Sequence, residues 1–170
     1  MSLEKFGRGL VIWPSSLLIN ENKKIEVFDE DLEFRVQVLI KLMGISRGVG
    51  IAAPQAGLNE QIFIAMINNM ATEFINPEII HREGEVHSNE GCLSIPNYRD
   101  TLIRSAEVVV AYNDRKGNRL TLEAKGMEAI VLQHETDHLN GKVFVDHLST
   151  MKRAIAMRKI SKFKKKFVRS

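Results

Sequence analysis

The segment His134-Glu135-Thr136-Asp137-His138, called HETDH below, restricts the fold more than any other part of this sequence. Two histidines four positions apart project from the same face of an α-helix, one turn from each other, so both rings can reach a single cation. The glutamate between them is offset toward a water molecule bound to that cation. The pattern therefore predicts a helix that carries two metal ligands and a general base.

Apolar residues precede this motif at helical spacing. Met127, Ile130 and Val131 lie seven, four and three positions before His134, which predicts that the histidines share a stripe with buried residues. A buried neutral histidine needs a polar partner, and a shared metal ion supplies one. The alternative is a pair of hydrogen-bonded core histidines beside a surface glutamate.

The single cysteine of the chain is the candidate for a third metal ligand. A catalytic metal site takes three protein ligands and leaves one position open. No third histidine follows HETDH at the spacing of the longer zinc-peptidase motifs, since the next one is His147. Cys92 follows Gly91, which lets the backbone approach a metal, and the Leu93 amide can point into the site. The alternative for Cys92 is a small buried hydrophobic residue.

A third segment, Gly48–Gln55 with the sequence GVGIAAPQ, is rich in small residues that allow close backbone approach. The side-chain amide of Gln55 can donate a hydrogen bond to an oxyanion. The segment is not a phosphate-binding loop, because it lacks a Gly-Lys-Ser/Thr ending and the predicted helix precedes it. Taken alone, it is also compatible with simple tight packing.

Hydrophobic periodicity and turn residues outline the remaining elements. Predicted strands occur in clusters rather than alternating with helices, which is typical of an α+β fold with antiparallel sheets. Asn76-Pro77 interrupts one strand and predicts an edge or a bend, and Gly117 is expected to take a positive φ in a hairpin. We predict helices at 29–43, 126–140 and from about 149 onward, and strands at 61–67, 74–80, 107–112 and 119–123.

Positive charge is concentrated at the C-terminal end. Residues 151–170 hold nine of the 24 Lys and Arg residues and none of the 21 Asp and Glu residues, so residues 1–150 carry a net charge of −6. Ala156, Ile160, Phe163 and Phe167 recur there at helical spacing, so one side of this helix is expected to pack on the body. The basic side favours contact with nucleic-acid phosphates, and the alternative is an ordinary solvated face.

Length and composition exclude several classes of protein. A chain of 170 residues with 44% hydrophobic and 26% charged residues is typical of one globular domain, here 1–170 with a basic C-terminal helix at 151–170. One cysteine excludes an intramolecular disulfide and fits a reducing compartment. No apolar run approaches the roughly 18 residues of a membrane span, and the first residues lack the apolar core of a secretory signal. We expect a cytoplasmic protein, or an organellar one whose transit peptide has been removed.

Taken together, GVGIAAPQ, EGCLS (residues 90–94) and HETDH resemble the three ordered motifs of the peptide deformylases. The similarity extends from Trp13-Pro14 to the segment that follows His138. Departures are few: Ile51 stands where the family usually has Leu, and Gln61 stands where an arginine is common. The resemblance implies an α+β fold with antiparallel β-sheets packed around a central metal-binding helix, plus a C-terminal helix.

The resemblance also implies an activity, namely removal of the N-formyl group from the initiator methionine of nascent polypeptides, with release of formate. Cys92, His134 and His138 would hold one divalent metal, natively Fe2+, with Zn2+, Ni2+ or Co2+ as substitutes. Glu135 would be the general base, and Gln55 and the Leu93 amide would stabilise the oxyanion. The implied substrate-binding residues are Val49, Gly50, Arg99, Met127, Ile130 and Val131, and an ion pair between Glu90 and Arg104 would support the site.

The implied partners are formyl-Met nascent peptides and, through the basic C-terminal helix, the ribosome. Neither a membrane nor DNA is expected as a partner, and the protein is expected to be a monomer. Two other functions remain open at this stage. A metallopeptidase sharing only the HETDH helix would draw its third ligand from downstream, whereas Cys92 lies upstream. A ribosome- or nucleic-acid-binding module with a structural metal would need four protein ligands, and the sequence offers three.

Overall fold

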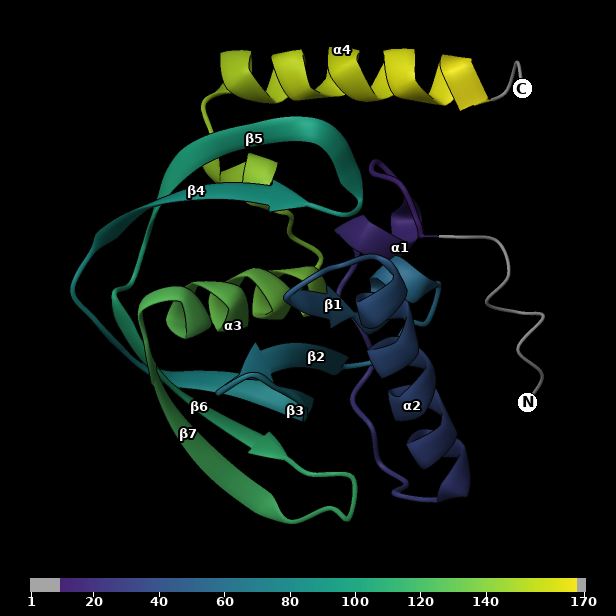
Figure 1. Cartoon of the computed structure of the whole chain (residues 1–170), viewed down its shortest axis with the longest axis vertical. Coiled ribbons are helices and arrows are strands. Elements are labelled where there is room, and N and C mark those ends of the chain that lie inside the picture. Colours follow the sequence, from purple (N-terminus) through teal and green to yellow (C-terminus); the bar gives the residue numbers. More distant parts are fainter. Residues whose placement is uncertain (1–9, 168–170) are drawn as a thin grey trace.

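The structure, a computed structural model, describes residues 10–167, with the side chains of residues 10–165 (Figure 1). Its strands form a five-stranded antiparallel sheet, ordered β1-β2-β3-β6-β7, and a two-stranded antiparallel hairpin, β4-β5. The strands are β1 Gly50–Ala52, β2 Ile62–Ile67, β3 Met70–Glu83, β4 Val86–Cys92, β5 Ile95–Arg104, β6 Glu107–Asn113 and β7 Arg119–Lys125. The helices are α1 Ser16–Ile19, α2 Glu30–Ile45, η2 Ala53–Ala56, α3 Gly126–Leu139, η3 Phe144–His147 and α4 Thr150–Phe167.

Helix α3 lies in the middle of the molecule, between the β4-β5 hairpin and the five-stranded sheet (Figure 1). It packs directly on β1 and β2. Helix α2 contacts the β1 and β2 end of the sheet, and α4 lies along β5 on the outer side of the hairpin. This arrangement confirms the predicted α+β fold.

Helix α2 forms where the sequence predicts it. The Asp29 side chain accepts a hydrogen bond from the Leu32 amide at 2.9 Å and so caps the first turn. Val36, Leu39 and Met43 continue the buried face from Leu32, which packs on the end of the sheet. The helix runs to Ile45, two residues beyond its predicted end at residue 43.

Strand β3 contains the Asn76-Pro77 interruption, and the structure decides between an edge and a bend. β3 lies in the centre of the sheet, and its register with β6 shifts between Ile75 and Glu78. Asn76 has a φ of 48°, and its side-chain amide bonds to the Ile25 backbone at 2.8 Å. The interruption is therefore a bulge in a central strand, where proline removes no ladder hydrogen bond.

Of the stripe that precedes HETDH, only Val131 joins the hydrophobic core, so the prediction was right for Val131 and wrong for Met127 and Ile130. Met127 is 68% exposed and Ile130 is partly buried, although Val131 is buried. The core face of α3 consists of Val131 together with Ala129, Leu132 and Leu139, which pack with β2 and β6 residues. Helical spacing identified residues that share a face but not the surroundings of that face.

Helix α4 packs on the body through a small apolar face and through ion pairs of Lys152 with Asp100 and of Arg153 with Asp146. Ala156 and Ile160 are buried in a cluster that includes Trp13 and Ile95, and Phe163 is partly buried. The side chain of Phe167, which the sequence also placed on this face, lies outside the described residues. No helix within residues 10–167 is long and apolar enough to cross a membrane.

Candidate metal centre

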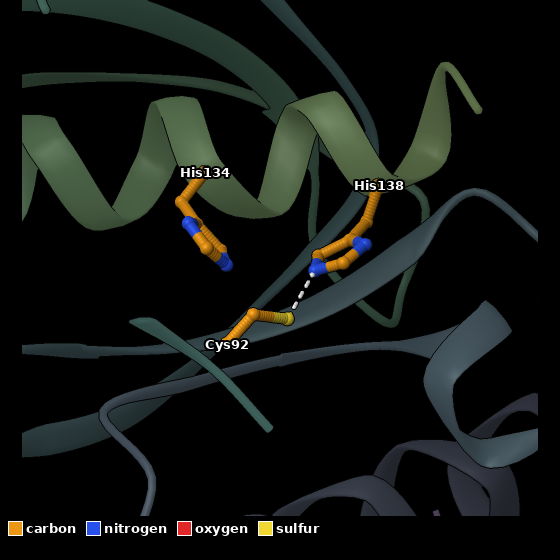
Figure 2. Close-up of side chains that lie close together, drawn as sticks. All are labelled: Cys92, His134 and His138. Atoms are coloured by element: carbon orange, nitrogen blue, oxygen red, sulfur yellow. Dashed lines mark hydrogen bonds between the residues drawn. The ribbon is translucent and has the colours of Figure 1, made fainter. Parts of the chain in front are cut away.

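The structure brings Cys92, His134 and His138 together (Figure 2). One potential ligand atom from each lies within 4.8 Å of the others, and the Cys92 Sγ is 3.2 Å from the His138 Nε2. Both histidines project from one face of α3 toward the cysteine, which reaches them from the end of β4 (Figure 2). Cys92, which lies 42 and 46 positions before the two histidines in sequence, therefore joins them in one cluster.

The donor set fits a divalent metal ion. His138 is fully buried, and its Nδ1 has no hydrogen-bond partner among the described residues. Burial raises the pKa of the Cys92 thiol, but the neighbouring His138 and His134 outweigh this effect and lower the pKa to about 5. A thiolate is the form of cysteine that binds metals. One thiolate and two imidazoles suit Fe2+, Co2+, Ni2+ or Zn2+.

Four further side chains form a hydrogen-bonded network that begins at His134. The Nδ1 of His134 is 2.8 Å from the Glu90 carboxylate, which fixes the ring and leaves Nε2 free for a metal. Arg104 donates two hydrogen bonds to Glu90, at 2.8 and 3.0 Å, and one to Asp137 at 2.6 Å. His147 lies 2.8 Å from the same Asp137 oxygen. Glu90 and Arg104 thus form a buried ion pair within the hairpin, and their contacts with His134 and Asp137 tie the hairpin to α3.

Each carboxylate in this network remains charged because of its partners. Burial raises the pKa of Glu90, but hydrogen bonds from His134 and Arg104 outweigh burial and lower the pKa to about 2. Burial likewise raises the pKa of Asp137, and His147 together with Arg104 lowers it to about 2. Glu90 and Asp137 are therefore both ionised at neutral pH, and each is paired with cationic side chains.

Glu135 has a different environment. It is 4% exposed, and its Oε2 has no hydrogen-bond partner among the described residues. Burial raises the pKa of this carboxyl to about 7, although His134 and His138 act in the opposite direction. A Cβ atom at Gly50 would collide with the carboxylate, so glycine at this position lets β1 approach it closely. Glu135 can therefore exchange a proton near neutral pH.

Gln55 lies beside the cluster and is held at both ends. Its Oε1 accepts a hydrogen bond from the Ala52 amide at 2.8 Å. Its Nε2 points to the Cys92 Sγ at 3.4 Å and to the Ser94 Oγ at 3.2 Å. Ser94 is fully buried, and sequence reasoning missed its contact with Gln55 because the two residues are distant in the chain.

A cavity of about 1110 Å³ opens beside the cluster. It lies between the segment that leads into β1, the β4-β5 hairpin and the first turns of α3. Leu93 and all six residues predicted to bind substrate line it, namely Val49, Gly50, Arg99, Met127, Ile130 and Val131. Arg47, His87 and Asn97 also line it, and no sequence motif predicted them.

These features define a class of protein with a Cys/His/His metal-binding cluster and a buried glutamate at the side of an open cavity. The model of the polypeptide deformylase family matches residues 8–154. The chain belongs to the peptide deformylase family, whose members are enzymes.

Individual relatives agree with this assignment. A peptide deformylase of Chromobacterium violaceum is 39% identical over 156 residues, which cover 90% of this chain and 93% of that protein. One from Borreliella burgdorferi is 43% identical over 141 residues, covering 81% and 86%. The crystal structure of a peptide deformylase from Legionella pneumophila superimposes with a TM-score of 0.91 at 39% identity, covering 96% of this chain and 98% of that one.

Proposed function

We propose that this chain removes the N-formyl group from the N-terminal formylmethionine of nascent polypeptides and releases formate. The observation that carries the proposal is the position of the buried Glu135 carboxyl between the two histidines of a three-ligand cluster, at the side of a cavity large enough for a peptide end. The membership of the family supports the same reaction.

Cys92, His134 and His138 would hold one divalent ion, and we propose Fe2+ as the native one. Such an ion supplies a Lewis acid and lowers the pKa of a bound water molecule toward neutrality. The thiolate of Cys92 brings a negative charge to the ligand set, which favours Fe2+, Co2+ or Ni2+ over zinc for reactivity. The Glu90–Arg104 pair keeps the His134 ring oriented for binding.

Glu135 would act as the base and then as the acid. Its carboxylate takes the proton of the water that attacks the formyl carbon, and it passes that proton to the departing amine. The pKa of about 7, caused by burial, makes both transfers feasible near neutral pH. The approach of Gly50 limits the space around the carboxylate and restricts its position.

The oxygen of the formyl group gains negative charge during the attack. The Nε2 of Gln55 and the backbone amide of Leu93 are the donors that would stabilise it. The two hydrogen bonds that hold Gln55 fix its amide beside Cys92 before substrate binds. One such donor contributes roughly 3 kcal/mol to transition-state stabilisation.

The methionine side chain of the substrate would occupy the apolar part of the cavity. This surface consists of Val49, Met127, Ile130 and Val131. The exposed fractions of Val49 and Met127 are 55% and 68%, so both leave apolar surface that a ligand can contact. Met127 and Ile130, which the sequence pattern assigned to the core, therefore suit a substrate pocket. Arg99 lies at the edge of the same cavity.

The remaining parts of the proposal concern the cell. We propose that the chain acts in the cytoplasm, or in an organelle, as a monomer with a single catalytic domain over 1–170. The basic face of α4 would hold it at ribosomal RNA, where formylated chains emerge. The charge contrast between residues 151–170 and the rest supports this docking.

The test is an anaerobic assay of formate release from a formyl-Met-Ala-Ser peptide by the Fe2+-loaded protein, with and without a chelator. We expect turnover that the chelator removes and that added Fe2+ restores. A Glu135→Gln variant with full metal content serves as the control. Absence of formate release from metal-loaded protein would overturn the proposal.

A further inference from the structure

The charged residues in the exposed lining of the cavity are both arginines. They are Arg47 and Arg99, among the described residues. Its two carboxylates, Glu90 and Glu135, are 5% and 4% exposed. Glu90 is neutralised by Arg104, and Glu135 is the proposed base. A peptide that enters the cavity therefore meets cationic groups without any exposed anionic one among the described lining residues.

Arg99 is held in a fixed position. Its Nε and Nη2 donate hydrogen bonds to the side-chain and backbone oxygens of Asn89, at 2.9 and 2.7 Å. Its stem passes over Gly91, since a Cβ atom there would lie 3.1 Å from the Arg99 Cγ and Nη1. The bonds to Asn89 reduce the entropy that the side chain would lose on binding an anion, and the Nη1 stays available.

The location of this guanidinium relative to the metal centre fixes which substrate residue it meets. It extends from Gly91 to Asn89, one to three residues from Cys92 along β4. At a strand rise of about 3.3 Å per residue this corresponds to roughly 3–10 Å. A peptide that has its formyl group at the metal centre and extends alongside β4 would advance by the same rise. Its second and third residues would then lie beside Arg99.

Arg47 lines the same cavity from a different segment, the turn between α2 and β1. Its φ is 53°, a left-handed conformation that favours glycine or asparagine after a helix. Its side chain is exposed and has no hydrogen bond or ion pair within the described residues. The turn thus holds an unneutralised charge at the cavity in a position where a smaller residue would fit the backbone better.

We propose that Arg47 and Arg99 select substrates by charge, favouring nascent peptides with Asp or Glu at the second or third residue over those with Lys or Arg. This inference rests on the proposed function and specifies its substrate class. The two guanidinium groups attract a carboxylate and repel an ammonium group. The selection is local, because residues 1–150 as a whole are acidic.

The test uses C-terminally amidated formyl-Met-Ala-Xaa-Ala peptides with Asp, Ser or Lys at the third position, and a second set with the charge at the second position. Amidation removes the terminal carboxylate, which would otherwise supply the same chemistry. We expect kcat/KM for Asp to exceed that for Lys about ten-fold in low salt, since each exposed pair contributes a factor of about two to five. The ratio should approach one in 0.5 M salt.

Variants assign the effect to the two arginines. Arg47→Glu should lower the Asp-to-Lys ratio of kcat/KM at least three-fold. The double variant with Arg47→Glu and Arg99→Met should lower it further. Lys41→Glu changes the net charge equally from an exposed site on α2 that does not line the cavity, so it should leave the ratio within two-fold. A ratio measured within one preparation is independent of the fraction of folded enzyme.

The outcomes separate this inference from the proposed function. Hydrolysis of the Ser peptide with equal kcat/KM for Asp and Lys would overturn the charge selection and leave the deformylase proposal standing. A preference for Asp that Lys41→Glu lowers as much as Arg47→Glu would also overturn it. No formate from any of the peptides would overturn the proposed function and this inference with it.

Discussion

Helices α3 and α4 combine apolar with polar and charged residues at helical spacing, yet they treat polar groups in opposite ways. In α3, Gln133, Glu135 and His138 are 2%, 4% and 0% exposed. In α4, the basic side chains are mostly exposed, and only Ala156 and Ile160 are buried among its described side chains. The free energy of each buried polar group in α3 depends on its own partner. The exposed charges of α4 are screened by solvent, so their electrostatic effects add up over several residues.

The expected free-energy cost of a substitution follows from this difference in burial. Removing one partner from a buried ion pair costs about 3–5 kcal/mol, because the other charge is left in a medium of low dielectric constant. An exposed pair contributes about 0.2–1 kcal/mol. Substitutions in and behind α3 should therefore have large and specific effects, and substitutions on α4 small and cumulative ones.

The largest expected effect is that of Glu135→Gln in α3. Loss of the proposed base should lower kcat for formate release about 10²–10⁴-fold while the metal content stays near one per chain. Metal analysis and single-substrate kinetics on the same preparation measure both quantities. Near-normal turnover would refute the role of Glu135.

Arg104→Met should have the next largest effect, on stability. It removes the arginine from the buried Glu90 and the partly buried Asp137 and leaves them only His134 and His147 as partners, so we expect the free energy of unfolding to fall by about 3 kcal/mol in urea denaturation. Metal affinity should also fall about 10–100-fold, because Glu90 orients His134.

Arg115→Met is the matched control for Arg104→Met. Arg115 also bridges two carboxylates, Glu33 and Glu73, but its side chain is 27% exposed against 4% for Arg104. We expect a loss of about 1 kcal/mol and unchanged metal affinity. Equal losses for the two variants would show that burial does not distinguish the two networks.

Ile130→Trp addresses the cavity face of α3. A bulky ring in the proposed methionine pocket should lower kcat/KM for formyl-Met peptides about 10–200-fold. A formyl-Ala peptide, which needs less space, should be affected less. An unchanged preference for methionine over alanine would place the pocket elsewhere in the cavity.

The smallest effects are expected on α4. Arg158, Lys162 and Lys165 are exposed, so changing all three to Gln should leave peptide turnover within two-fold. If α4 contacts ribosomal RNA, the slope of log affinity against log salt should fall by about two to three. A ribosome pelleting assay across salt concentrations measures this slope, and an unchanged slope would contradict docking through these residues.

Truncation after Thr150 is a less specific test of the same question. It removes Ala156 and Ile160 from a buried cluster and breaks the ion pair between Lys152 and Asp100. Deleting one large buried aliphatic side chain already costs about 2–5 kcal/mol. The truncated chain would therefore lose stability as well as charge, and the exposed substitutions separate the two.

The amino-acid sequence by itself determined much of the chemistry and the local structure. The four-residue spacing of His134 and His138 required a helix, Asp29 marked where α2 begins, and the glycines at 117 and 141 took the positive φ that ends a hairpin turn or a helix. These outcomes depend on neighbours within a few residues. Local sterics and hydrogen bonds are therefore sufficient to decide them.

Other features were decided only by the tertiary structure. The polar strands β4 and β5 escaped prediction because their alternation is weak, yet their hairpin carries Cys92 to the histidines. The cavity, the contact of Ser94 with Gln55, and the placement of Arg47 and Arg99 at one cavity all join distant segments. Periodicity tells which residues share a face, but what that face meets depends on long-range packing. For this reason Met127 and Ile130 were assigned to the core and instead line the cavity, whereas Val131 belongs to both.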